Sequence, residues 1–492
     1  MRTTLIQGKY LLALLLTVVG CSEERRITTQ SSKARELYNA GVSQWEKFYF
    51  VEAQKSFEEA IHLDSAFAMA WARLAFVSEG TQNRDKALNE IGRAIALAAH
   101  ATPYEQLFVR LQGYRLTFSN KQALDLADSM ADSYPDEKEV HLVRGNLYEL
   151  NKNFDAAIRS YRMAIDIDTS YSLAVMFLGY AYSTIGEQEK AVAQMERYIR
   201  LAPDAPDPRA SFADILFRVG RYDEALQQYQ RSLELKPDYW YSAMQIGHIY
   251  ALKGRLKEAQ QQYNKSMASL PQSDQLRANH AALNANLNMR RGAYKEAIRQ
   301  YQEALGLDST NGEAAYGLVS AFRTLKNFRH AHQVLGVIRA ELMRRHLEES
   351  QYMIKYYLSR ARVLTDEEKY ELALAACDSA LEFTTELTRS PVFQQIAEVN
   401  LREKQYEDAL DACEEALRTN PNNPEALFTL VKVYHATGDA AMTKEIAGRL
   451  LALWENADPD FVSLQELRDL LRAKNAHVDL LSRSRAFAAT VS

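Results

Sequence analysis

The sequence lacks the features that mark disulfide-rich proteins and the common classes of enzyme. Three cysteines in 492 residues are too few for a disulfide framework. There is no glycine-rich phosphate loop, no helix with paired zinc-binding histidines and no glycine-x-serine-x-glycine elbow. His330 and His332 are two residues apart, so they cannot bind a metal together from one helix face. We therefore expect no enzyme activity, no metal and no cofactor.

The chain also lacks an excess of positive charge. It holds 59 lysines and arginines against 64 acidic residues, a net charge of −5. Loss of the first twenty residues would leave 57 basic residues and a net charge of −7. Because neutralising phosphates requires a basic surface, this balance argues against nucleic acid as the main partner, although it leaves a local basic patch open.

A short apolar run near the N-terminus predicts a signal peptide. Residues 10–19 are ten apolar residues, too few to span a bilayer as a permanent helix. They follow two basic residues, so residues 1–20 are predicted to be a secretory signal peptide. The run ends in the sequence VVGC, with Cys21 last. These four residues resemble the bacterial lipobox.

The lipobox resemblance implies a lipid anchor. It implies diacylglycerol on the thiol of Cys21, cleavage before that residue and acylation of its amine, and two or three acyl chains make a stable anchor. Ser22, in place of Asp, implies transfer to the outer membrane facing the periplasm. Residues 21–33 then form the anchor and a polar, flexible tether. An ordinary signal peptide with a chance cysteine and an uncleaved anchor stay open as alternatives.

The rest of the chain repeats a pair of short helices. In the stretch 206–237, the first helix covers about 209–218 and stops at Gly220, which can take a left-handed conformation. The second helix begins near Asp223 and ends before Pro237. An alanine with the same helical surroundings recurs every 34 to 42 residues, at Ala53, Ala87, Ala123, Ala157, Ala191, Ala225, Ala259, Ala297, Ala331, Ala373 and Ala409.

This pattern resembles the tetratricopeptide repeat, which has a period of 34, small residues at positions 8, 20 and 27, an aromatic residue at position 24 and a proline at position 32. The resemblance covers about residues 34–457. It implies an all-α fold, a right-handed α-solenoid of about 12 repeats, with residues 458–492 forming a capping helix and tail. The alternative is an irregular helical bundle whose periodicity is accidental.

Two interruptions break the regular spacing. Four extra residues lie around 271–277. Eight extra residues lie between Ile338 and Ile354, where the absence of proline and glycine predicts a lengthened second helix or a longer helical connection. Cys377 and Cys413 both occupy position 24, in helices of adjacent repeats that should be too far apart for a disulfide. We interpret both as small buried hydrophobic residues.

In the family that the sequence resembles, the first helix of each repeat lines a concave groove, so its exposed positions are the predicted partner site. The residues carried over are Phe76, Gln112, Asn146, Met176, Tyr180, Asp214, Phe217, Met244, His248, Asn286 and Tyr316. The same positions also contain Trp45, Ser320, Arg323 and Arg362. A mixture of aromatic, methionine and polar side chains suits an extended peptide or a helix.

The resemblance therefore implies a membrane-anchored scaffold of the bacterial cell envelope that binds protein or peptide partners. No three consecutive repeats supply the lysine and asparagine set of the family's carboxylate clamp; the repeat with Asn146 has Leu142 where the lysine should be. A second hypothesis is a carbohydrate-binding accessory factor for the cell wall or exopolysaccharide, with Tyr180 and Trp45 stacking on sugars.

Overall fold

The computed structural model describes residues 27–81, 83–270, 272–345, 347, 352–386 and 388–472. The predicted signal peptide and Cys21 lie outside this range. Within it, the secondary structure is helical throughout, with twelve pairs of α-helices, a 3-10 helix η1 (Ala98–His100) and a further helix over 462–472. No helix of the described part is long and apolar enough to cross a bilayer.

The first helices of the twelve repeats are α1 (Ser32–Glu46), α3 (Ala68–Gly80), α5 (Pro103–Leu116), α7 (Lys138–Leu150), α9 (Ser172–Thr184), α11 (Asp207–Arg218), α13 (Trp240–Leu252), α15 (Asp274–Arg290), α17 (Gly312–Thr324), α19 (Tyr352–Asp366), α21 (Ser390–Glu403) and α23 (Pro424–Thr437). The second helices are α2 (Phe50–Leu63), α4 (Arg84–Leu97), α6 (Asn120–Ser133), α8 (Phe154–Ile167), α10 (Gln188–Leu201), α12 (Tyr222–Leu235), α14 (Leu256–Ala268), α16 (Tyr294–Leu307), α18 (Phe328–Arg344), α20 (Tyr370–Leu381), α22 (Tyr406–Leu417) and α24 (Ala440–Leu453).

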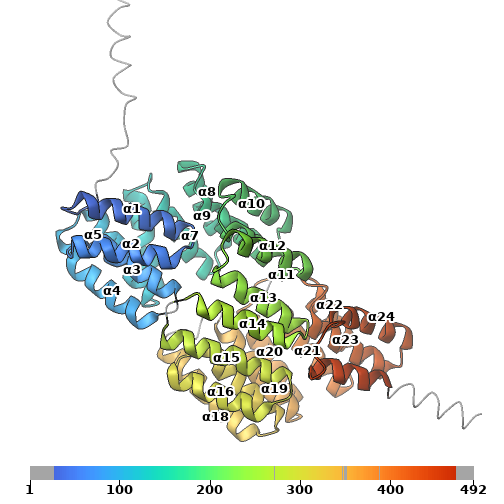
Figure 1. Ribbon diagram of the computed structural model, residues 1–492. Coiled ribbons are helices and arrows are strands. Elements are labelled where there is room, and N and C mark those ends of the chain that lie inside the picture. The colour runs from blue at the N-terminus through green and yellow to red at the C-terminus, as the bar shows by residue number, and fades with distance from the viewer. Residues whose placement is uncertain are drawn as a thin grey trace, which may run out of the picture.

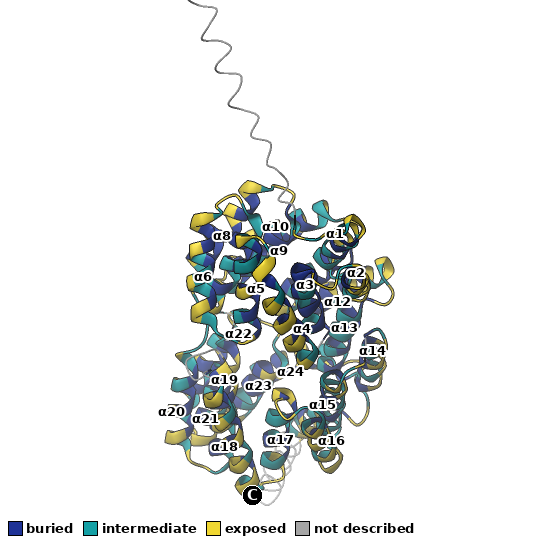
Figure 2. Ribbon diagram, turned by 90° about the vertical axis from the view of Figure 1, so that its left-hand side faces the viewer, coloured by how far each residue is buried: buried dark blue, intermediate teal, exposed yellow. Residues whose placement is uncertain are grey.

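Each first helix packs against the second helix of its own repeat, and each pair packs against the next, which gives the predicted solenoid (Figure 1). All eleven recurrent alanines are fully buried in this packing. Figure 2 shows the result, helices that are buried along one face and exposed along the other. Since isolated helices of 12 to 17 residues are marginal in water, burial between neighbours is what holds them.

Small residues at position 8 accept the aromatic ring of position 24. A β-carbon added to Gly145 would lie 2.4 Å from the ring of Tyr161, and one added to Gly41 would lie 2.7 Å from Phe57. Any side chain at these positions would push the two helices of the repeat apart. Cys377 and Cys413 fill the same slot in repeats 10 and 11, where both are buried and unpaired, and burial raises the pKa of each thiol to about 12.

Both interruptions of the repeat coincide with lengthened helices, which the sequence predicted for the longer one only. Helix α15 has 17 residues and α18 also has 17, against 12 to 15 in the other paired helices. Of the remainder of the longer interruption, before α19, the structure describes Arg345 and Leu347, and Leu347 is buried.

The start of the described chain is fixed to the repeats. The backbone N–H and hydroxyl of Thr28 donate to the carboxylate of Glu105 at 2.8 and 2.6 Å. The hydroxyl of Thr29 donates to Asp64 at 2.5 Å, and Ile27 packs against the first hydrophobic cluster. A flexible tether was predicted as far as residue 33, so for residues 27–33 that prediction needs correction. A free tether can only precede Ile27.

The superhelix closes on itself, because repeats about six apart in sequence touch along their edges. In Figure 1 the C-terminal helices α21 to α24 lie beside α11 to α14. The contacts join Lys236 to Glu52 (2.7 Å), Arg84 to Gln275 (3.0 Å), Lys152 to Glu382 (3.3 Å), Asn420 to Tyr222 (3.0 Å), Asn422 to Gly220 (3.2 Å), Trp454 to Leu252 (3.1 Å) and Asp458 to Gly254 (2.9 Å). We call this line of contacts the seam.

Glycines at the hairpin turns allow the closest contacts of the seam. Gly220 and Gly254 have φ of +79° and +74°, the left-handed conformation predicted for Gly220 from the sequence. An added β-carbon at Gly220 would lie 2.2 Å from the side-chain oxygen of Asn420, and one at Gly254 would lie 2.6 Å from the ring of Phe461. The bare backbone therefore lets the neighbouring turn of the superhelix reach the carbonyl groups of these hairpins.

The C-terminal helix covers the end of the solenoid and also extends the seam. Leu464 and Leu467 are buried in one cluster with α14 and α24, whereas Glu466, Arg468 and Asp469 are exposed. The predicted polar outer face of a capping helix is therefore present. Its inner face packs on repeat 7 as well as on repeat 12, which the sequence did not indicate.

Candidate functional site

The predicted groove residues lie on the first helices, and none of them is freely exposed. Gln112 and Met176 are buried, and the other nine are half-buried. They differ in whether the side chain already forms hydrogen bonds or ring contacts with other residues of the chain.

Four position-9 side chains are tied to a buried tyrosine of their own repeat. The tyrosine stands at position 24, fifteen residues further on, and its ring crosses the hairpin so that the hydroxyl reaches the first helix. The pairs are Tyr161 with Asn146 (2.8 Å), Tyr229 with Asp214, Tyr263 with His248 (3.0 Å) and Tyr301 with Asn286. A buried hydroxyl needs a hydrogen-bond partner, and these position-9 side chains supply it. A ligand would therefore have to compete with the tyrosine hydroxyl for them.

Asp214 is the most heavily engaged of the four. Besides Tyr229, the hydroxyls of Tyr180 and Tyr241 donate to its carboxylate at 2.6 and 2.8 Å. Burial raises the pKa of Asp214, while the three hydrogen bonds oppose that rise. The Arg218 guanidinium lies 5.2 Å from the centre of the Tyr180 ring. Tyr180 and Asp214 therefore stabilise repeats 5 to 7 together.

A second buried carboxylate lies at the start of α11. Asp207 accepts hydrogen bonds from Tyr239 (2.7 Å), Tyr198 (2.8 Å) and Ser211 (3.1 Å). Burial raises the pKa of Asp207 to about 6 in spite of these bonds. Sequence analysis did not single this residue out, because no residue was carried over from position 2 of the repeat, which Asp207 occupies.

In the N-terminal repeats, side chains from different first helices meet across the concave side. Arg73 of α3 forms two hydrogen bonds of 2.6 Å with Glu139 of α7, two repeats away. Arg115 lies 4.9 Å from the ring centre of Phe76, which in turn packs against Trp45. Here the chain fills its own concave surface.

His248 is unsuited to acid–base chemistry at neutral pH. Burial lowers its pKa to about 4, so the imidazole is neutral and pairs with Tyr263. Phe217 packs edge-on against Tyr222, with ring centres 5.4 Å apart. In the described part of the chain, no group of three or more His, Cys, Asp or Glu side chains is arranged to hold a metal.

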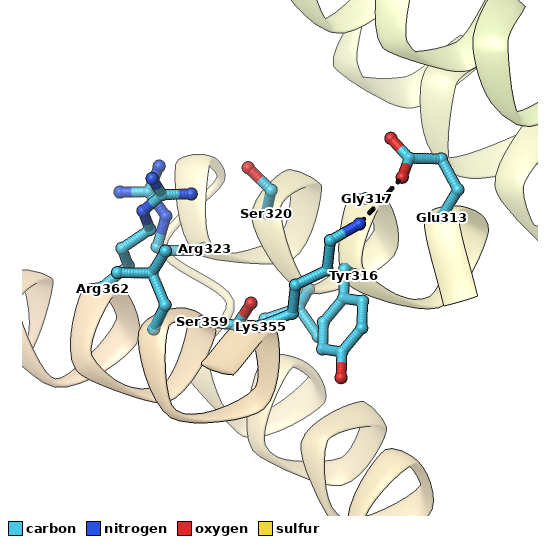
Figure 3. Close-up of a pocket in the computed structure, with 10 residues that line it drawn as sticks. Glu313, Tyr316, Gly317, Ser320, Arg323, Lys355, Ser359 and Arg362 are labelled. Atoms are coloured by element: carbon cyan, nitrogen blue, oxygen red, sulfur yellow. Dashed lines mark ion pairs between the residues drawn. The ribbon is translucent and has the colours of Figure 1, made fainter. Parts of the chain in front are cut away.

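Repeats 9 and 10 differ, because their first helices leave a cavity of about 260 Å³ between α17 and α19 (Figure 3). Four side chains at predicted groove positions line it: Tyr316, Ser320, Arg323 and Arg362. The complete lining consists of Glu313, Tyr316, Gly317, Val319, Ser320, Arg323, Lys355, Leu358, Ser359 and Arg362. In the view of Figure 3 the side chains of Arg323 and Arg362 lie at one end of the cavity, and the ion pair of Lys355 with Glu313 (3.7 Å) lies at the other.

Comparison with known families agrees with the repeat architecture. Sequence models described as tetratricopeptide repeat match residues 120–172, 174–205, 211–274 and 400–467. With twelve stacked helical hairpins in the fold, these matches show that the chain belongs to the tetratricopeptide repeat superfamily. Such repeats typically serve as scaffolds for interactions between proteins, and the chain has the architecture of an interaction scaffold.

Solved structures with the same kind of fold are only distantly similar. Yeast Tom70 is 12% identical, with 90% of this chain and 96% of that chain aligned at a TM-score of 0.39. Human IFIT1, solved as a dimer with m7Gppp-AAAA, is 15% identical over 87% of this chain and 91% of its own, at a TM-score of 0.40. No curated protein matches the sequence. Similarity at this level does not indicate what the chain binds.

Proposed function

We propose that the protein is a membrane-anchored interaction scaffold of the bacterial cell envelope, which binds a protein partner on the concave side of repeats 9 and 10. The observation that carries this proposal is the cavity between α17 and α19. It combines apolar walls, formed by Leu358 and Val319, with polar and charged groups that converge on one space, as binding sites do.

The anchoring part of the proposal rests on the lipobox-like end of the signal peptide at Cys21. Contacts of Thr28 with Glu105 fix the chain from Ile27 onward. The five residues from Ser22 to Arg26 span at most about 18 Å when extended. Repeats 1 to 3 would therefore face the outer membrane closely, with repeats 9 and 10 free to meet a partner in the periplasm.

Sugar stacking at Tyr180 and Trp45 gains no support from the structure. The Tyr180 hydroxyl is bonded to Asp214 and its ring lies beside Arg218. The Trp45 ring packs against Phe76, with Arg73 lying 5.5 Å from its centre. Since both aromatic side chains already have partners within the chain, we put forward no second function.

Site-specific photo-crosslinking in cells tests the scaffold. A photoreactive amino acid at Ser359, inside the cavity, should crosslink to a defined protein partner. The matched control is the same amino acid at Arg339, an exposed residue of α18. Equal crosslinking from both positions, or none from Ser359, would contradict a scaffold that binds a protein partner here in the cell.

The lipid anchor is tested separately with Cys21→Ser. The variant should leave the membrane fraction and become soluble in the periplasm, because acyl chains can no longer attach to residue 21. Sedimentation of the variant with membranes in high salt would rule out the lipid anchor. The crosslinking test of the scaffold does not depend on this result.

A further inference from the structure

Repeats 9 and 10 do not have the position-24 tyrosine that bonds to position 9 in repeats 4, 6, 7 and 8. Position 24 holds Leu335 in repeat 9 and Cys377 in repeat 10, where four other repeats have a tyrosine. Neither replacement carries a hydroxyl that needs an acceptor. Ser320 and Arg362 at position 9 are thereby released from the role that their equivalents have in repeats 4, 6, 7 and 8.

The released side chains face a cavity with surplus positive charge. Arg323, Lys355 and Arg362 line it together with a single carboxylate, Glu313. Arg323 has a close partner, Asp366 at 2.7 Å, which lies outside the lining, but its Nε is buried and has no hydrogen-bond partner.

Arg362 is less well neutralised than Arg323. Its guanidinium forms an ion pair with the carboxylate of Glu425, with 3.8 Å between nitrogen and oxygen. Burial lowers the pKa of Arg362, and the charge of Arg323 acts in the same direction, only partly offset by Glu425. Two arginines that face one space therefore lack a shared anion.

Two hydroxyls complete the set. Among the hydrogen bonds of the described residues, none involves the side-chain oxygen of Ser320 or Ser359, and both serines line the cavity beside the arginines. Guanidinium groups with neighbouring hydroxyl donors are the usual way to hold a carboxylate or phosphate oxyanion.

We infer that this cavity is a subsite for an oxyanion, a carboxylate or a phosphate, carried by a peptide segment that lies along α17 and α19. The inference rests on the proposed function, since it names the chemistry of the partner bound there. Arg362 and the guanidinium of Arg323 hold the oxyanion, the two serines donate to it, and Leu358 and Tyr316 contact the side chains next to it.

Selection from peptide libraries tests the oxyanion subsite. The full chain in detergent is offered a random 12-residue library and a second library with phosphoserine fixed at the centre. Selected peptides should be enriched in Asp or Glu at one position, or should require the phosphate. Replacing that group by an amide or an unmodified serine should weaken binding at least tenfold in fluorescence anisotropy.

Variants of the chain provide the matched comparison. Arg362→Gln should weaken binding of the selected peptides at least tenfold, whereas Arg339→Gln, the same loss of charge at an exposed residue of α18, should change it less than twofold. Replacing Ser320 and Ser359 together by alanine should weaken binding several-fold without changing the charge, which keeps the test valid if Arg362→Gln does not fold.

The subsite is refuted if the selected peptides have no preference for acidic or phosphorylated residues, or if all three variants bind them equally. A protein crosslinked from Ser359 in cells, combined with no acidic preference, would leave the scaffold standing and remove the subsite. Acid-dependent peptide binding without any cellular crosslink would remove the scaffold and leave the subsite.

Discussion

Replacing Gly254 by alanine would test whether the seam holds the superhelix closed. Gly254 has φ +74°, where a β-carbon costs about 1 kcal/mol of backbone strain. That β-carbon would also lie 2.6 Å from the ring of Phe461 and 2.7 Å from the β-carbon of Ala457. Since these contacts are impossible, the segment 457–461 has to move or the hairpin has to distort.

Gly438 provides the matched control. Its φ is +85°, and an added β-carbon would meet nothing within 4 Å. Gly438→Ala therefore carries the same backbone strain without the collision. Overpacking a close contact costs typically about 1–3 kcal/mol, so Gly254→Ala should lose that much more unfolding free energy than Gly438→Ala.

Hydrogen exchange with mass spectrometry locates the effect. The amide of Asp458 donates to the carbonyl of Gly254 at 2.9 Å, so its protection reports directly on the seam. Exchange across residues 454–461 should accelerate in Gly254→Ala and stay unchanged in Gly438→Ala. Equal destabilisation by the two variants, with equal protection of Asp458, would show that the seam contributes nothing to the closed form.

Three further predictions concern stability. Asp207 has a pKa of about 6, above its unfolded value of 3.8, so its contribution to stability is present below pH 4 and is lost as the pH rises through 6. When the pH is lowered from 7 to 4, the unfolding free energy of the unsubstituted protein should rise by up to about 3 kcal/mol relative to that of Asp207→Asn. Parallel pH profiles of the two proteins in urea unfolding would exclude this. Ala225→Leu should destabilise by about 1–3 kcal/mol and lower the melting temperature, while Gln227→Leu on the exposed face of α12 should not. Lys326, at φ +56°, is exposed, so Lys326→Gly should raise stability by about 0.5–1 kcal/mol in urea unfolding.

The sequence predicted the local architecture closely, because each repeat depends on contacts between near neighbours. The helix predicted over about 209–218 corresponds to α11 (Asp207–Arg218), and the helix predicted from near Asp223 to before Pro237 corresponds to α12 (Tyr222–Leu235). These boundaries follow from short-range signals, small residues that permit close packing and turn residues that end helices.

The seam could not be predicted in the same way. Its contacts join residues about 184 to 230 positions apart, such as Lys236 with Glu52 and Lys152 with Glu382. Whether such residues meet depends on the pitch of the superhelix, which sums a small rotation over several repeats. Single positions in the sequence do not encode that sum.

The prediction treated all position-9 residues alike as ligand-facing, although the sequence contains the tyrosines that occupy some of them. Asn146 and Asn286 were expected to face a ligand, whereas each is bonded to the tyrosine fifteen residues later. A comparison of position 24 with position 9 in every repeat would have indicated this pairing. Ser359 was missed because it occupies position 6, which is not a groove position of the family pattern. Lys355 occupies position 2, which is a groove position, but no residue was carried over from position 2.

The seam has a consequence for how the chain reaches its native state. An open repeat array can fold unit by unit, since each unit depends only on its neighbours. Here Leu252 and Gly254 find their hydrogen-bond partners in Trp454 and Asp458, which are among the last described residues to be synthesised. The seam at repeat 7 can therefore form only after residues 454–458 have been synthesised, and a truncation near residue 450 would remove hydrogen-bond partners of residues about two hundred positions earlier in the chain.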